Sequence, residues 1–131
     1  MGEYNHTLDA KGRLIIPSKF RDSLGDKFVI TKGFDGCLFV YEDEEWLSFT
    51  EKLRNLPLSN KDARSLARFF LSNADEGEID KQGRVLIQAP LRAHAGLQKD
   101  VVLLGVGNRV EIWDKEKYEN EATFGDMDEI A

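Results

Sequence analysis

Short runs of apolar residues, separated by turns that contain glycine or proline, indicate a chain built mainly of short strands. In the first part of the chain, apolar side chains either alternate with polar ones or form short clusters, as they do in strands. The strands expected there are residues 4–8, 13–16, 28–31 and 37–41. Pro17 stands where a short helix can begin and Gly25 where it can end. The pair Asp35-Gly36 predicts a hairpin between the last two strands.

The middle and the end of the chain add helical patterns and two more strands. Apolar residues recur near helical spacing from Trp46 to Leu56, where Pro57 stops the run. Asn60 can cap a second helix, whose apolar residues fall on one face. Further along, Pro90 and Gly96 frame another short helix. Strands are expected at 101–104 and 109–113, followed by a helix from residue 115 that fades into an acidic tail.

The chain contains an internal repeat. The segment DAKGRLIIPSKFR at 9–21 aligns without a gap with DKQGRVLIQAPLR at 80–92. A unit of about 50 residues is too small to bury a stable core alone, so two units are expected to share one core as a pseudo-dimer. We therefore expect an α+β fold in one domain. Its parts are a first repeat over 4–56, a connecting helix over 57–75, a second repeat over 76–122 and an acidic tail over 123–131.

Composition narrows the functional classes. The 131 residues include a single cysteine, Cys37, which excludes an internal disulfide and a thiolate metal cage within one chain. His6 and His94 have no partners at ligand spacing, so no metal site and no cofactor are expected. No apolar run approaches the roughly 20 residues of a membrane-spanning helix, and the first residues lack the apolar stretch of a signal peptide. A cytoplasmic protein is the expectation.

The sequence also lacks the common signatures of an enzyme, so no enzymatic activity is expected. The sequence has no G-x-S-x-G elbow, no phosphate-binding P-loop, no G-x-G-x-x-G before a helix and no H-E-x-x-H. No candidate nucleophile stands beside a general base.

The charge distribution leaves room for a nucleic-acid partner despite a net charge of −6. Residues 9–21 carry four basic side chains against one acidic one, a net of 4 − 1 = +3. Residues 111–131 carry eight acidic side chains against two lysines, a net of 2 − 8 = −6. The first segment can form a locally basic face on an acidic body.

The arrangement D-x-K-G-R-L-x-x-P-x-x-F-R at 9–21, with its D-x-x-G-R copy at 80–84, resembles the MraZ family of bacterial regulators, part of the wider AbrB-like (SpoVT-AbrB) group of DNA-binding proteins. The resemblance extends over nearly the whole chain. It implies two tandem swapped-hairpin β-barrel-like repeats with flanking helices, and assembly into a ring-shaped homo-oligomer. It also implies a nucleoid-associated transcriptional regulator, a repressor in our expectation. Such a regulator binds short direct repeats in double-stranded DNA upstream of the division and cell-wall gene cluster.

The candidate site residues fall on the two D-x-x-G-R turns and just beyond the first. Arginine suits guanine readout because its planar fork matches O6 and N7 together. The expected DNA-binding residues are Arg13, Lys11, Arg84, Lys19 and Arg21. Asp9, Gly12, Asp80 and Gly83 are expected to shape the turns or orient an arginine. The alternative is that each arginine only pairs with the aspartate four residues before it. Since Lys11 becomes Gln82 in the second copy, that copy is the weaker candidate for direct contact.

Two further hypotheses stay open. One is a ring-forming structural or interaction scaffold that recruits a protein partner through its acidic surface. The other keeps DNA binding but adds restraint by the acidic tail, which would compete for the basic face. Deletion of residues 125–131 would then tighten binding and reduce its selectivity.

Overall fold

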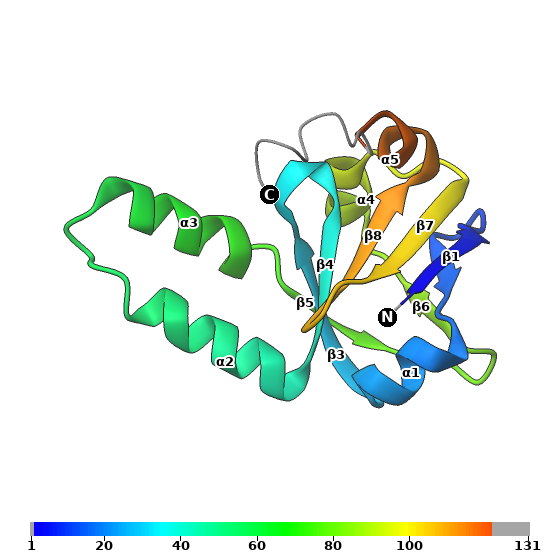
Figure 1. Ribbon diagram of the computed structural model, residues 1–131, viewed down its shortest axis with the longest axis horizontal. Coiled ribbons are helices and arrows are strands. Elements are labelled where there is room, and N and C mark those ends of the chain that lie inside the picture. Colours follow the sequence, from blue (N-terminus) through cyan, green and yellow to red (C-terminus); the bar gives the residue numbers. More distant parts are fainter. Residues whose placement is uncertain (1, 122–131) are drawn as a thin grey trace, which may run out of the picture.

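The computed structural model describes residues 2–121, so the predicted acidic tail over 123–131 lies outside the described residues. Within that range the fold is a mixed α+β one: an antiparallel six-stranded sheet, a two-stranded ribbon and five α-helices (Figure 1). The strands are β1 (Gly2–Thr7), β2 (Arg13–Ile15), β3 (Lys27–Lys32), β4 (Leu38–Glu42), β5 (Asp75–Glu78), β6 (Arg84–Leu86), β7 (Asp100–Gly105) and β8 (Val110–Asp114). The helices are α1 (Ser18–Leu24), α2 (Asp43–Arg54), α3 (Lys61–Leu71), α4 (Ala89–Ala95) and α5 (Lys115–Glu121).

Local signals in the sequence define most of these elements. Pro17 precedes α1 and Gly25 follows it with a positive φ. Asn60 caps α3, since its side-chain oxygen accepts from the backbone N–H groups of Asp62 and Ala63 at 2.8 and 3.1 Å. A one-turn 3₁₀ segment containing Asp35 connects β3 and β4, as the hairpin signal predicts.

The strand order exchanges strands between the two halves of the chain. The large sheet has the order β1-β7-β8-β4-β3-β5, so β1 pairs with a strand of the second half and β5 with a strand of the first. The counterparts in the two halves are β1 and β5, β3 and β7, and β4 and β8. Exchanging each strand for its counterpart gives the same order read in reverse. The two halves also pair through equivalent strands, β4 with β8 in the large sheet and β2 with β6 in the ribbon. Neither half can therefore complete its sheet without the other.

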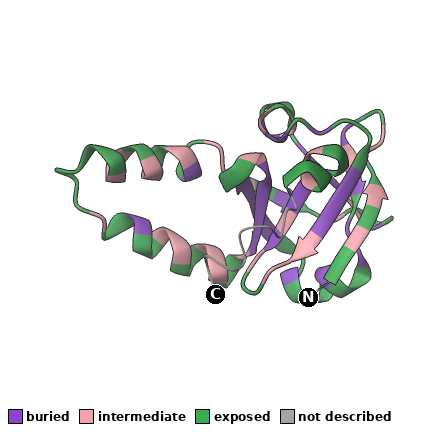
Figure 2. Ribbon diagram, turned by 45° about the horizontal axis from the view of Figure 1, so that its top comes forward, coloured by how far each residue is buried: buried purple, intermediate pink, exposed green. Residues whose placement is uncertain are grey.

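One hydrophobic core joins the two halves. It lies between the large sheet, the ribbon of β2 and β6, and the short helices α1 and α4. Ile16 and Ile87, which follow the two ribbon strands, are both almost fully buried in it. Figure 2 shows buried residues concentrated in the strands of the sheet. Burial of apolar area from both halves in one core supplies the stabilisation that either would lack alone.

An aromatic cluster covers the rest of the sheet and anchors a helical arm. Helices α2 and α3 form a hairpin that projects from the sheet (Figure 1). Phe70 of α3 is buried there, and its backbone carbonyl accepts a hydrogen bond from the buried hydroxyl of Thr31 at 2.7 Å. Trp46, Phe69 and Tyr118 are partly buried against the same cluster. Ring contacts within this cluster, such as that between Phe39 of β4 and Phe70 of α3, attach the arm to the sheet.

Strand β5 was not among the strands expected from the pattern, because its sequence DEGE has no apolar side chain. It pairs with β3 along its whole length, and Gly77 lies over the ring of Phe28, where a Cβ atom would collide. The repeat could have revealed it, since an offset of 71 places β1 over this segment. No helix among residues 2–121 has the length and apolar character needed to cross a membrane.

Candidate nucleic-acid interface

The two-stranded ribbon of β2 and β6 has one face in the core and one face toward solvent. At its centre, Leu14 lies opposite Val85, and both side chains are buried. Side chains alternate along a strand, and directly opposed residues share a face. The residues on either side of the central pair therefore point outward. These outward residues, which we call the ribbon face, form the opposed pairs Arg13 with Leu86 and Arg84 with Ile15.

A tight turn stands at one end of the ribbon and is organised by Asp9. One carboxylate oxygen, Oδ1, accepts from the backbone N–H groups of Lys11 and Arg13, both at 2.9 Å. The other, Oδ2, accepts from Nε of Arg13 at 2.8 Å. These bonds lower the pKa of Asp9, with the backbone N–H of Arg13 as the largest cause. Asp9 is thus an ionised acceptor that orients an arginine.

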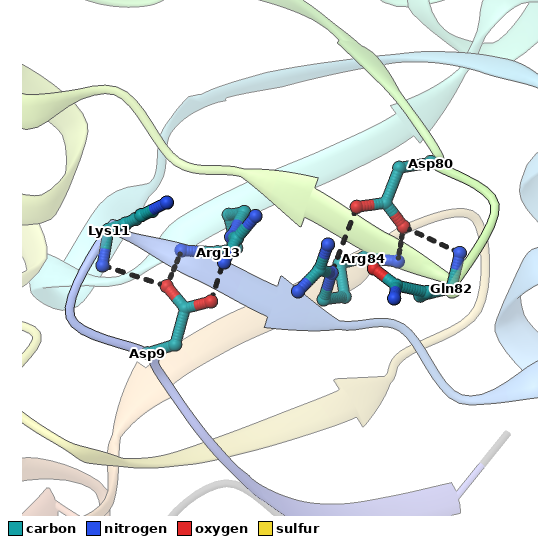
Figure 3. Close-up of polar contacts among 6 residues, drawn as sticks. All are labelled: Asp9, Lys11, Arg13, Asp80, Gln82 and Arg84. Carbon is teal, nitrogen blue, oxygen red and sulfur yellow. Dashed lines mark hydrogen bonds and ion pairs between the residues drawn. The ribbon is translucent and has the colours of Figure 1, made fainter.

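The turn at the other end of the ribbon repeats this geometry. Asp80 Oδ1 accepts from the backbone N–H groups of Gln82 and Arg84 at 2.9 Å, and Oδ2 accepts from Nε of Arg84 at 2.9 Å. The pKa of Asp80 is lowered, first by the backbone N–H of Arg84. Figure 3 shows the two turns at opposite ends of the ribbon, with Arg13 and Arg84 near its middle. The repeat in the sequence is thus also a repeat in structure.

The pairing of each arginine with its aspartate occurs in both copies, and it leaves part of each guanidinium available. Only Nε is engaged, so within residues 2–121 the terminal nitrogens of Arg13 and Arg84 have no hydrogen-bond partner. The side chains are 31% and 24% exposed, respectively. An orienting role for the aspartate and an outward-facing fork for the arginine are therefore compatible.

Each turn is backed by an arginine from the other repeat. Nη1 of Arg21, on α1, lies where a Cβ atom on Gly83 would come within 2.5 Å of it. Nε of Arg21 is buried, with no hydrogen-bond partner among the described residues. In the same way Arg92, on α4, lies against Gly12, and a Cβ atom there would collide with its guanidinium. Both glycines have positive φ angles, +82° at Gly12 and +79° at Gly83. The absence of a side chain therefore allows the positive φ of each turn and leaves room for the neighbouring arginine.

The predicted site residues do not form one basic segment. Lys11 lies at the first turn, exposed beside Arg13, whereas the chain after β2 runs toward the second turn. Arg21 therefore lies at the second turn, and Lys19 is exposed on the same helix. The net charge of +3 over residues 9–21 is divided between the two ends of the ribbon.

Sequence reasoning missed several residues of this region. Lys81 is exposed in the second turn, one position before Gln82, so this turn retains a lysine. The alignment of the two copies could have shown it. Arg92 aligns with Arg21 and supports the first turn in the reciprocal manner. Each turn thus has one exposed lysine and one arginine from the other repeat, so the two turns differ less in basic side chains than the change from Lys11 to Gln82 indicates. Within residues 2–121, no three His, Cys, Asp or Glu side chains are grouped so that they could hold a metal ion.

Comparison with known proteins identifies the relatives of this chain. The family model described as "MraZ protein, putative antitoxin-like" matches residues 1–69 and again residues 70–124. A protein of Lachnoclostridium phytofermentans named "Transcriptional regulator MraZ" is 60% identical over 131 residues, covering 100% of this chain and 92% of that protein. Proteins of the same name from a Thermoanaerobacter species and from Ligilactobacillus salivarius are 59% and 57% identical over 133 aligned residues. Both alignments cover 100% of this chain and 93% of the relative. These names describe regulators and not enzymes.

Proposed function

This chain belongs to the MraZ family, and from that premise we propose that it is a sequence-specific DNA-binding transcriptional regulator. Relatives that align with this chain over nearly their full length are named transcriptional regulators, which supports the regulatory role. We propose further that it represses the division and cell-wall gene cluster, including its own gene. In this proposal it binds short direct repeats as a ring-shaped homo-oligomer.

The observation that carries the proposal is the ribbon face. Two arginines, Arg13 and Arg84, project from the two-stranded ribbon, each held at Nε by an ionised aspartate. The major groove of B-DNA, ~12 Å wide, admits a two-stranded ribbon. A correctly placed arginine contributes roughly 1–3 kcal/mol of discrimination at a guanine. The aspartates fix the orientation of the fork before binding, which reduces the entropy lost on contact.

The other predicted residues take supporting roles in the proposed interface. Lys11 and Lys19 are exposed near the two turns and would contact phosphates, which position a protein without specifying sequence. Arg21 contributes to the proposed interface at the second turn, because its guanidinium lies against Gly83. Gly12 and Gly83 allow the turns to close. Since the second turn keeps Lys81, we propose that both repeats contact DNA.

We also propose the finer architecture that the resemblance implies. The chain is one domain of two swapped-hairpin, barrel-like repeats over 4–56 and 76–122, connected over 57–75 and followed by an acidic tail. The exchange of β1 and β5 between the halves and the pairing of β2 with β6 support this assignment.

Oligomer formation would compensate for weak binding by one chain. A net charge of −6 and a small basic face predict low affinity for a single site. Several identical faces on one ring, matched to several direct repeats, raise the effective concentration at each further site. Repeats spaced near a multiple of one DNA turn, ~10 bp, would present the same side of the duplex to successive faces.

The test compares labelled duplexes from the DNA upstream of the protein's own gene, carrying either one repeat or the full array. We expect the array to bind at least tenfold more tightly, with affinity falling steeply as salt rises. Equal affinity for one and several repeats would contradict the oligomer mechanism. No binding to any upstream duplex at physiological salt would contradict DNA binding itself and favour the scaffold with a protein partner.

A further inference from the structure

Two exposed apolar side chains occupy equivalent positions in the two repeats and share the ribbon face with the arginines. Ile15 is 45% exposed and Leu86 is 46% exposed, although their strand neighbours Leu14 and Val85 are buried. Ile15 lies directly opposite Arg84, and Leu86 lies directly opposite Arg13. A single exposed apolar residue needs no explanation, but this pair recurs through the repeat and adjoins the proposed readers.

Folding does not account for both residues. A β-branched side chain favours a strand, which could explain Ile15, but Leu86 is not β-branched and holds the same place. Neither side chain is part of the hydrophobic core. The buried alternation on the other side of the ribbon fixes both side chains outward, so neither can turn into the interior without breaking the register.

We propose that Ile15 and Leu86 are specificity-determining residues that contact the C5-methyl groups of thymines in the major groove. This inference rests on the proposed DNA-binding function and adds the base that the apolar positions read. In the major groove, thymine alone among the four bases presents a methyl group, and apolar side chains recognise it by contact. The cationic forks on the same face favour a duplex over an apolar protein partner as the occupant.

The dimensions of the ribbon relate the methyl contact to the arginine contact. Residues two apart on a strand are separated by about 7 Å, which equals two base-pair steps of ~3.4 Å. Opposed residues across the ribbon are about 5 Å apart. Each apolar side chain is therefore within two base pairs of an arginine on the same face. The expected readout is a guanine with a thymine at most two base pairs away, once for each repeat.

The experiment replaces one methyl group at a time in the DNA. A duplex from the DNA upstream of the gene, trimmed to the repeats that the full-length protein protects, is synthesised with deoxyuridine in place of thymidine at each position in turn. Binding of the wild type, Ile15→Ala, Leu86→Ala and Leu58→Ala is measured by fluorescence anisotropy. Leu58 is the matched control, an 84% exposed leucine on the connection between α2 and α3. Thermal unfolding and light scattering of each variant establish its fold and its oligomeric mass.

We expect uracil at one or two positions of each repeat to weaken wild-type binding about fourfold, the loss of one buried methyl group. Ile15→Ala should lose its sensitivity at one of these positions and Leu86→Ala at another, because the methyl group has lost its partner. Leu58→Ala should keep the full wild-type profile.

This inference is overturned, and the proposed function left intact, if uracil changes the affinity less than twofold at every position while replacement of guanine still abolishes binding. A changed oligomeric mass in Ile15→Ala with an unchanged uracil profile also overturns it. Absence of any sequence-selective binding overturns both.

Discussion

The backbone N–H of Ile16 donates a hydrogen bond to the carbonyl oxygen of Gly83 at 2.9 Å, across the boundary between the two repeats. The reciprocal bond, from Ile87 to Gly12, has the same length. Each repeat thus closes its own turn against the strand of the other. The outward arginines are held by a structure that neither repeat can build alone. The ribbon face and the side chains buried in the shared core lie on opposite sides of the same two strands.

The turn glycines should tolerate a side chain less well than a glycine that meets no neighbour. Gly12→Ala is expected to reduce the free energy of unfolding by about 2–3 kcal/mol, because it adds a collision with Arg92 to the strain of a positive φ. Gly96→Ala is the matched control, since Gly96 is left-handed with φ of +60° and nothing lies within 4 Å of the added Cβ. It should cost about 1–2 kcal/mol. Equal losses in urea unfolding would contradict the supporting role of Arg92.

The shape of the guanidinium, and not only its charge, should matter at position 13. Arg13→Lys keeps the positive charge but loses both the Nε bond to Asp9 and the fork. Affinity for the repeats should fall about tenfold, while affinity for unrelated DNA should stay the same, as anisotropy on both duplexes would show. Arg54→Lys, at a 76% exposed position on α2, is the control and should bind both as the wild type does. A uniform loss on both duplexes would indicate phosphate contact only.

At low pH, the stabilisation that Asp9 and Asp80 give to the two turns should be lost over the same pH range. The pKa values of Asp9 and Asp80 lie below the ordinary value of 3.8 in the folded protein, so their contribution to stability is present above about pH 4. It is lost as the pH falls through the folded pKa values. The double variant Asp9→Asn, Asp80→Asn should therefore be less stable than the wild type at pH 5–7, with the gap shrinking below about pH 4. A gap that is constant from pH 7 to pH 3 would contradict the ionic role.

Cys37 should be inert in the folded protein. Burial raises the pKa of its thiol to about 12, with smaller contributions from Glu111 and Asp35, so almost no thiolate forms at pH 8. The side chain is also inaccessible. Labelling by iodoacetamide at pH 8 should be negligible in the native state and complete in urea. Rapid native labelling without unfolding would show that this end of the sheet opens locally.

The sequence contained enough local information to define most elements, because their signals lie within a few residues. Asn60 predicted a helix start through its cap, and Asp35-Gly36 predicted a hairpin. The acidic strand β5 lacked such a signal: it is held by backbone pairing to β3, to which its side chains contribute nothing apolar. Only comparison with the first repeat could have located it.

The sequence predicted the two turns of the candidate site, but it did not predict how the turns are arranged in space. The repeat placed Asp9 and Arg13 in one turn and Asp80 and Arg84 in its copy, and the pairing within each turn follows from a spacing of four residues. Which strands pair across the halves is a long-range property that no local pattern encodes. For that reason the position of Arg21 at the second turn was not foreseen.

The central claim is that the ribbon face carries the DNA contact, and binding by Arg13→Ala and Arg84→Ala tests it most directly. Anisotropy is measured across a salt series on a labelled duplex carrying the full upstream array, with oligomer size checked by size-exclusion chromatography. Because the two turns share one geometry, we predict comparable losses of at least tenfold in sequence-selective affinity for both variants, with the oligomer intact. Wild-type affinity in both variants would contradict the account.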